Sequence, residues 1–139
     1  MYNTFMKTQI IAYFSSLVSL AVLDYAWLSV MLKRFYSPRL VHLTADSPSY
    51  GPAVLFYILY AIGVIIFIVL PSVSEHSSFS KIFLLGALLG LVSYGAYDLT
   101  NGATLKNWPS IVSVVDMAWG ATLTGLASMI SVYITKIFA

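Results

Sequence analysis

The sequence predicts an all-α integral membrane protein, a bundle of four transmembrane helices joined by short loops. Hydrophobic residues make up 60% of its 139 residues and charged residues only 9%, whereas a soluble domain is about 25% charged. The apolar residues form four runs, each of which reaches the roughly 20 residues that cross a bilayer. We expect one transmembrane domain over residues 1–139, with spans at about 8–32, 53–72, 82–105 and 110–138.

The first span is closed by Lys33 and Arg34. Its apolar run is longer than the core of a signal peptide and no small-residue cleavage site follows, so we expect a retained span. Trp27, Phe35 and Tyr36 are candidates for anchors at the membrane interface. A long loop is predicted to begin at Lys33, with residues 35–43 as a short amphipathic piece on the membrane surface.

The second span carries no charge and is predicted to end at Pro71. A short polar connection, residues 73–81, leads to the third span. That span begins with Gly86 and Gly90, whose GxxxG spacing allows another helix backbone to approach closely. Residues 106–109 form a tight turn into the fourth span, where Gly120 and Gly125 are further close-packing positions.

Composition also limits function and topology. Cysteine is absent, which excludes disulfides and thiolate metal sites, and a net charge of +2 is too small to indicate a nucleic-acid partner. Lysines and arginines number four on one side of the bilayer and three on the other. This slight bias favours both termini outside, and the near balance would also permit insertion in both orientations.

Three aspartates lie inside the predicted spans at a similar depth. Asp24 and Asp98 lie eight and seven residues before the ends of spans one and three, and Asp116 lies about six residues into span four. At roughly 1.5 Å per residue, all three are about 9–12 Å below one membrane surface. Lipid cannot solvate such groups, so we expect each of them to face the interior of the bundle.

Each aspartate has a partner three residues on, and therefore on the same helix face: Trp27, Asn101 and Trp119. Tyr94 and Thr104 continue the face of Asp98. Three neighbouring carboxylates cannot all stay ionised in a low-dielectric site, so either some hold protons or a cation is bound. The predicted ligand-binding residues are Asp24, Trp27, Tyr94, Tyr97, Asp98, Asn101, Thr104, Asp116 and Trp119.

An internal repeat of two helices is also possible from the pattern. Residues 23–38 (LDYAWLSVMLKRFYSP) and 97–110 (YDLTNGATLKNWPS) both show an aspartate, then Leu-Lys, an aromatic residue and a proline. A shift of two spans would make the halves parallel repeats, a plan known in transporters.

The motifs resemble a known family. They are D-x-x-W-L at 24–28, F-Y at 35–36, YDLTN-x-ATL-x-x-WP at 97–109 and V-x-D-x-x-WG at 114–120. Together they are similar to a family of small bacterial predicted membrane proteins, domain of unknown function 2177, over nearly the whole chain. The resemblance implies a four-span membrane protein of bacterial origin, in the inner membrane, and implies no activity.

Three functions are compatible with this sequence. The first is a carrier, coupled to protons or cations, that binds a small cationic or polar solute by carboxylates and by cation–π contacts. It resembles small multidrug-resistance transporters in plan alone, and it requires a homodimer. The second is an enzyme in which Asp98 and Asp116 are acid and base, or in which Asp98, Asn101 and Asp116 hold a divalent ion. The third is a structural protein whose buried polar groups only hold helices together.

Some of these residues also have an alternative explanation that is purely structural. Asp24 could pair with Lys33 or Arg34, and Lys106 could neutralise Asp98 or Asp116. Residues 101–102 (Asn-Gly) could end span three early, and the tryptophans could be interface anchors. We favour binding and transport over catalysis, with the lipid bilayer, a second copy of the chain and a small molecule or cation as partners. No cofactor and no nucleic acid are expected.

Overall fold

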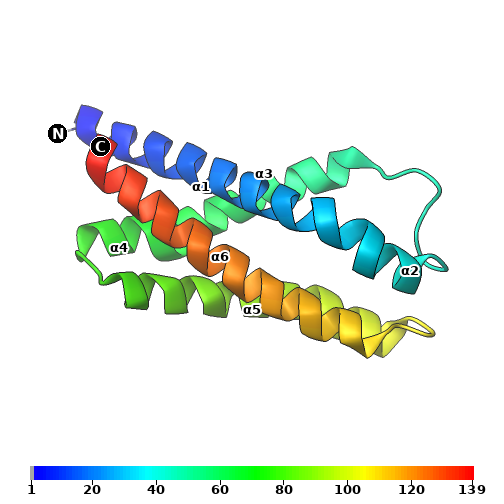
Figure 1. Ribbon diagram of the computed structural model, residues 1–139. Coiled ribbons are helices and arrows are strands. Elements are labelled where there is room, and N and C mark those ends of the chain that lie inside the picture. The colour runs from blue at the N-terminus through cyan, green and yellow to red at the C-terminus, as the bar shows by residue number, and fades with distance from the viewer. Residues whose placement is uncertain (1) are drawn as a thin grey trace.

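The computed structural model describes residues 2–139, which form four long helical segments without a β-strand among them (Figure 1). The first segment joins α1 (Tyr2–Met31), the π-helical turn η1 (Leu32–Tyr36) and α2 (Ser37–Leu40). The second joins α3 (Tyr50–Val64), the π-helical turn η2 (Ile65–Val69) and α4 (Leu70–Ser74). Helices α5 (Phe79–Thr104) and α6 (Ser110–Phe138) are the third and fourth. The predicted all-α architecture of four helices is confirmed.

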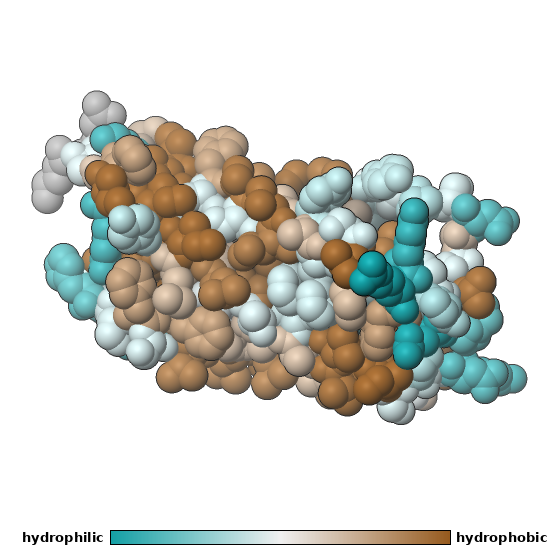
Figure 2. Space-filling view, viewed as in Figure 1, coloured by the Kyte–Doolittle hydropathy of each residue, from teal (hydrophilic) through white to brown (hydrophobic). Residues whose placement is uncertain are grey.

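All four segments are long and apolar enough to cross a membrane: the candidate span of the first is Thr4–Leu40, with 37 residues, and the other three have 25, 26 and 29 residues. The burial of polar and apolar side chains supports this reading. Thr124, Ser131 and Asp98 have no exposed surface, whereas Phe67 and Leu84 are 69% and 66% exposed. Figure 2 shows a largely hydrophobic surface between two hydrophilic ends. A polar interior inside an apolar exterior is the distribution that lipid requires.

The first segment is longer than predicted, and the predicted loop from Lys33 is wrong. The chain stays helical through Leu40, because Lys33 and Arg34 are good helix formers and can continue a helix out of the apolar layer. Within η1, the hydrogen bond is one residue wider than in an α-helix: the Ser37 N–H bonds to the Leu32 carbonyl.

The second segment also continues past its predicted end. Pro71 lies in the first turn of α4, and the helix runs to Ser74. Proline has no N–H, and its ring would clash with the carbonyl four residues before it in a regular helix. The π-helical turn η2 precedes it, with the Leu70 N–H bonded to the Ile65 carbonyl, so the register is already widened where the proline enters.

Helices α5 and α6 make the closest helix contact in the bundle, as the glycine spacing predicts. A Cβ atom on Gly86 would lie 2.9 Å from the Gly125 Cα atom. A Cβ atom on Gly90 would lie 2.0 Å from the Gly120 carbonyl oxygen. These positions admit only glycine because backbone meets backbone there. The prediction of close approach at these glycines is confirmed.

Helix α6 packs against both α5 and α1. Between α1 and α6, the Ser131 hydroxyl is 2.8 Å from the hydroxyls of Ser15 and Ser16 and donates to the Ala12 carbonyl at 3.1 Å. These contacts lie in the half of the bundle that holds both chain ends (Figure 1). Hydroxyl groups therefore stabilise the contact between α1 and α6 in this half of the bundle. The buried carboxylates lie in the other half.

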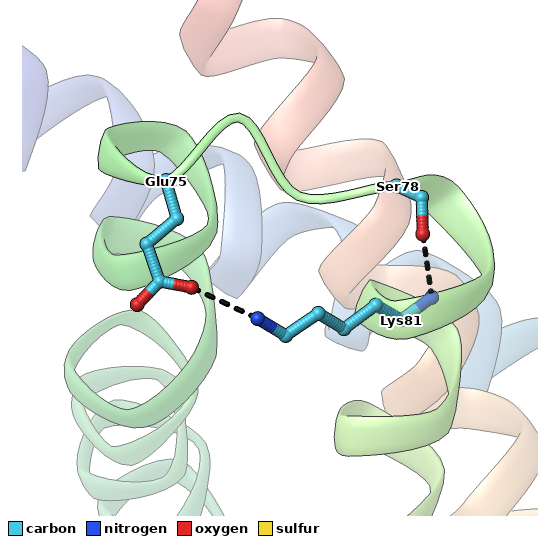
Figure 3. A network of polar contacts seen from close by, with 3 residues as sticks. All are labelled: Glu75, Ser78 and Lys81. Atoms are coloured by element: carbon cyan, nitrogen blue, oxygen red, sulfur yellow. Dashed lines mark hydrogen bonds and ion pairs between the residues drawn. The ribbon is translucent and has the colours of Figure 1, made fainter.

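An ion pair and a helix cap on the protein surface stabilise the connection between α4 and α5. Lys81 Nζ lies 2.9 Å from Glu75 Oε2, and the Ser78 hydroxyl accepts from the Lys81 N–H at 3.3 Å (Figure 3). Both charged side chains are more than half exposed. We expect Lys81→Met to lower the free energy of unfolding by less than about 1 kcal/mol, because exposed ion pairs are weak. Denaturation of the purified protein in mixed micelles measures this, and a loss of about 2 kcal/mol or more would contradict it.

Candidate functional site

A cavity of about 270 Å³ lies at the end of the bundle opposite the chain ends. Here α1 passes through η1 into α2, α5 ends and α6 begins. The first loop joins the α5–α6 turn at this end, where the His42 ring lies 3.3 Å from the Asn107 carbonyl oxygen. The cavity is lined by Asp24, Trp27, Leu28, Leu32, Tyr36, Ser37, Leu40, Thr44, Tyr94, Tyr97, Asp116 and Trp119.

Asp24 links three helices at the floor of this cavity. Its side chain is buried, and both of its oxygens accept a hydrogen bond. Trp119 of α6 donates its Nε1–H to one oxygen at 2.9 Å, and the Tyr57 hydroxyl of α3 donates to the other. A buried carboxylate needs such donors because no water or lipid replaces them.

Asp116 lines the same cavity and is only half-buried. The Tyr36 hydroxyl donates to Asp116 Oδ1, and the Trp27 Nε1–H donates to that hydroxyl oxygen at 3.1 Å. The Trp27 and Trp119 rings stack at 4.3 Å between centroids, with their planes within 5° of parallel. The two carboxylates are therefore joined through a stacked pair of indoles into one network.

Asp98 does not line the cavity. It is fully buried between α5 and α6, with the Asp116 carboxyl and the Ser113 hydroxyl beside it. The Ser113 hydroxyl donates to the main-chain oxygen of Asp98 at 3.4 Å and accepts from Trp108 Nε1–H at 2.9 Å. Neither carboxyl oxygen of Asp98 has a hydrogen-bond partner among residues 2–139.

Six of the nine predicted site residues therefore line one cavity: Asp24, Trp27, Tyr94, Tyr97, Asp116 and Trp119. Asn101 and Thr104 lie outside it, at the end of α5. The Thr104 hydroxyl is exposed and donates to the Thr100 carbonyl at 2.7 Å. The Asn101 carbonyl accepts from the Leu105 N–H at 2.8 Å. The alternative that residues 101–102 end the span early is wrong, because α5 continues to Thr104.

Two residues of the network were not predicted. Tyr36 was expected to be an interface anchor, but the π-helical turn directs its hydroxyl to Asp116. Tyr57 lies in the span without charges and nevertheless donates to Asp24. The one available signal was that a buried carboxylate needs donors, which tyrosines at the same depth can provide.

The alternative ion pairs are not found. Among residues 2–139 the single ion pair joins Lys81 and Glu75, so Asp24 is not paired with Lys33 or Arg34. Nor does Lys106 pair with Asp98 or Asp116 in the described chain. No cluster of three or more His, Asp or Glu side chains placed to hold a metal ion occurs within the same residues. Asp24 and Asp116 instead accept hydrogen bonds from neutral donors.

The fold and the site define a membrane protein with four apolar helices and a carboxylate-lined cavity at one end. The chain belongs to the family described as "Predicted membrane protein (DUF2177)", whose model matches residues 9–133. The resemblance inferred from the motifs is therefore confirmed. No curated protein and no solved structure matches the chain.

Proposed function

We propose that this protein binds a small organic cation in the cavity between Asp24 and Asp116. The observation that carries the proposal is the composition of the cavity wall: two carboxylates, two indoles and three phenols, without a lysine, arginine or histidine among the lining residues. Carboxylates attract a cation, and aromatic faces add cation–π attraction that is largest for tryptophan. An anion would meet only repulsion there.

The half-buried carboxylate of Asp116 is the group best placed to meet the ligand. Both oxygens of Asp24 already accept hydrogen bonds, whereas Asp116 accepts one, from Tyr36 at Oδ1. Among the described residues, no side chain donates a hydrogen bond to its second oxygen. A cavity of about 270 Å³ fits a small amine or a quaternary ammonium rather than a drug-sized molecule.

The test is a titration of the purified protein with tetramethylammonium, methylammonium and the neutral tert-butanol, followed by tryptophan fluorescence. We expect both ammonium ions to change the signal and tert-butanol to have little effect. Asp116→Asn keeps an acceptor for Tyr36 and removes the charge, so it should weaken cation binding at least about tenfold. Asp46→Asn, an exposed loop aspartate, is the matched control and should bind like the wild type. Equal binding of tert-butanol, or unchanged affinity in Asp116→Asn, would refute the proposal.

Transport of the cation is a further part of this proposal. The cavity lies at one end of the bundle, and hydroxyl contacts between α1 and α6 occupy the other half. A single chain of four helices therefore offers a binding site but little room for a path. We propose a homodimer in a bacterial inner membrane, with proton or cation coupling, as the transporting form.

A structural role is the second candidate, and a specific observation favours it. The hydrogen bonds to Asp24 and Asp116 tie α1, η1, α3 and α6 together. Interhelical hydrogen bonds of this kind stabilise membrane proteins by about 0.6 kcal/mol each on average. The two roles differ in the titration above, because a network that only joins helices has no reason to distinguish ammonium ions from tert-butanol.

A further inference from the structure

Asp98 is a buried carboxyl group that does not line the cavity and has no part in the proposed cation binding. Its side chain has no exposed surface, and both of its oxygens are buried without a hydrogen-bond partner among residues 2–139. The Ser113 hydroxyl donates to the main-chain oxygen of Asp98 and not to its carboxyl group. An ionised carboxylate in this position would have lost its water and gained no donor, which is the most unfavourable state for a buried charge.

The neighbouring titratable groups make ionisation harder still. On α6 the Asp116 carboxyl lies within hydrogen-bonding reach of Asp98, and Asp24 of α1 lines the same cavity as Asp116. Tyr97 is the neighbour of Asp98 in α5 and lines the cavity, and the hydroxyl of Tyr36 in η1 donates to Asp116. None of these groups is positive at neutral pH, and two carboxylates that share a site cannot both ionise without a cation.

A neutral Asp98 resolves both difficulties. Its O–H can donate to the Asp116 carboxylate beside it, so the proton occupies the space between the two acids. We infer that Asp98 is a proton-binding site behind the cavity, which holds one proton with Asp116 while the cavity is empty and releases it when a cation binds. In this exchange one positive charge enters the cavity and one proton leaves the acid pair, so the net charge of the site stays constant. The release step rests on the proposed function, whereas the proton site does not.

The proton site is tested without any ligand. Infrared spectra of the protein in lipid at neutral pH should contain the C=O stretch of a neutral carboxylic acid. Asp98→Asn should abolish that band, and Asp46→Asn should leave it unchanged, because Asp46 is exposed in a loop. The asparagine is isosteric with the neutral acid, so the variant should also keep its unfolding midpoint. Absence of the band in the wild type, or its persistence in Asp98→Asn, would overturn the inference.

A second set of variants covers a failure of Asp98→Asn to fold. The chain has five acidic residues, Asp24, Asp46, Glu75, Asp98 and Asp116. Isotope labelling of the aspartate carboxyl groups should shift the wild-type band. Such a shift would show that Glu75 is not the source of the band. The band should then survive in Asp24→Asn, Asp46→Asn and Asp116→Asn, which leaves Asp98. Its loss in Asp24→Asn, Asp46→Asn or Asp116→Asn would place the proton on that residue and overturn the assignment.

The release step has its own readout. Tetramethylammonium is added to weakly buffered protein with a pH-indicator dye, at concentrations that saturate the tryptophan signal of each variant. We expect about one proton per bound cation from the wild type and none from Asp98→Asn. If the cation binds and no proton appears, the exchange is wrong, and the infrared test alone decides whether Asp98 holds a proton. If no cation binds, the proposed function fails and the infrared result is unaffected.

Discussion

Replacing Gly90 by alanine is expected to destabilise the bundle more than any other single methyl group added at a glycine. The new Cβ atom would lie 2.0 Å from the Gly120 carbonyl oxygen and 2.7 Å from the Thr124 hydroxyl. The first obstacle is backbone on a facing helix, which cannot rotate away as a side chain can. Helices α5 and α6 must therefore separate, and we expect a loss of about 3 kcal/mol or more, at the upper end of overpacking effects.

The matched control is Gly63→Ala. Gly63 lies in α3, and no atom of another residue is within 4 Å of the Cβ position. Alanine is also the better helix former, so this variant should be as stable as the wild type or more so. Unfolding in mixed micelles, followed by circular dichroism, compares the two. Equal stability of Gly90→Ala and Gly63→Ala would show that the close contact between α5 and α6 does not form.

Asp24→Ala is expected to have the second largest effect. It removes the acceptor of two buried donors, the Trp119 indole N–H and the Tyr57 hydroxyl. Each unsatisfied buried donor costs about 1–3 kcal/mol, so a loss of about 2–5 kcal/mol in the free energy of unfolding should follow. The same truncation at the exposed residue Asp46 should change stability by less than about 0.5 kcal/mol.

Removing the Tyr57 hydroxyl tests whether the loss comes from an unsatisfied donor or only from lost packing. In a background of Tyr57→Phe, which has no hydroxyl to leave unsatisfied, Asp24→Ala should cost measurably less than in the wild type. A double-mutant cycle between the two positions gives the coupling energy directly. Additive effects would mean that the Tyr57–Asp24 hydrogen bond contributes nothing, and the description of Asp24 as a helix link would have to be withdrawn.

The sequence was sufficient for the parts of the site that regular helices determine. The regular periodicity of a helix, together with the inability of lipid to solvate a carboxylate, predicted that Asp24 and Asp98 face the interior of the bundle, and both are buried. The same regularity placed Trp27 and Trp119 each three residues beyond an aspartate, and the structure stacks their rings. Four apolar runs were likewise enough to predict four helices.

Irregular features explain what was missed. The π-helical turn η1 departs from α-helical periodicity, and Tyr36, its last residue, donates its hydroxyl to Asp116. No local pattern in the sequence predicts such a turn. At the end of α5, the three-residue spacing of Asp98, Asn101 and Thr104 on one helix face led us to place Asn101 and Thr104 in the site with Asp98. Trp108 instead folds back over this end, where its ring lies 5.9 Å from that of Tyr97 and its N–H reaches Ser113.

The length of the first helical segment has a consequence for where the cavity meets its surroundings. Thirty-seven residues rise about 55 Å, and even a tilt of about 40° leaves about 42 Å along the bilayer normal. The hydrocarbon layer is about 30 Å thick, so the segment extends beyond it, and the charges of Lys33 and Arg39 favour placing this end among the lipid headgroups. Tyr36 and Leu40, which wall the cavity, stand there as well. An anionic leaflet with a surface potential of about −30 mV concentrates monovalent cations roughly threefold at that level. Lipid composition would thereby set the local supply of the proposed ligand.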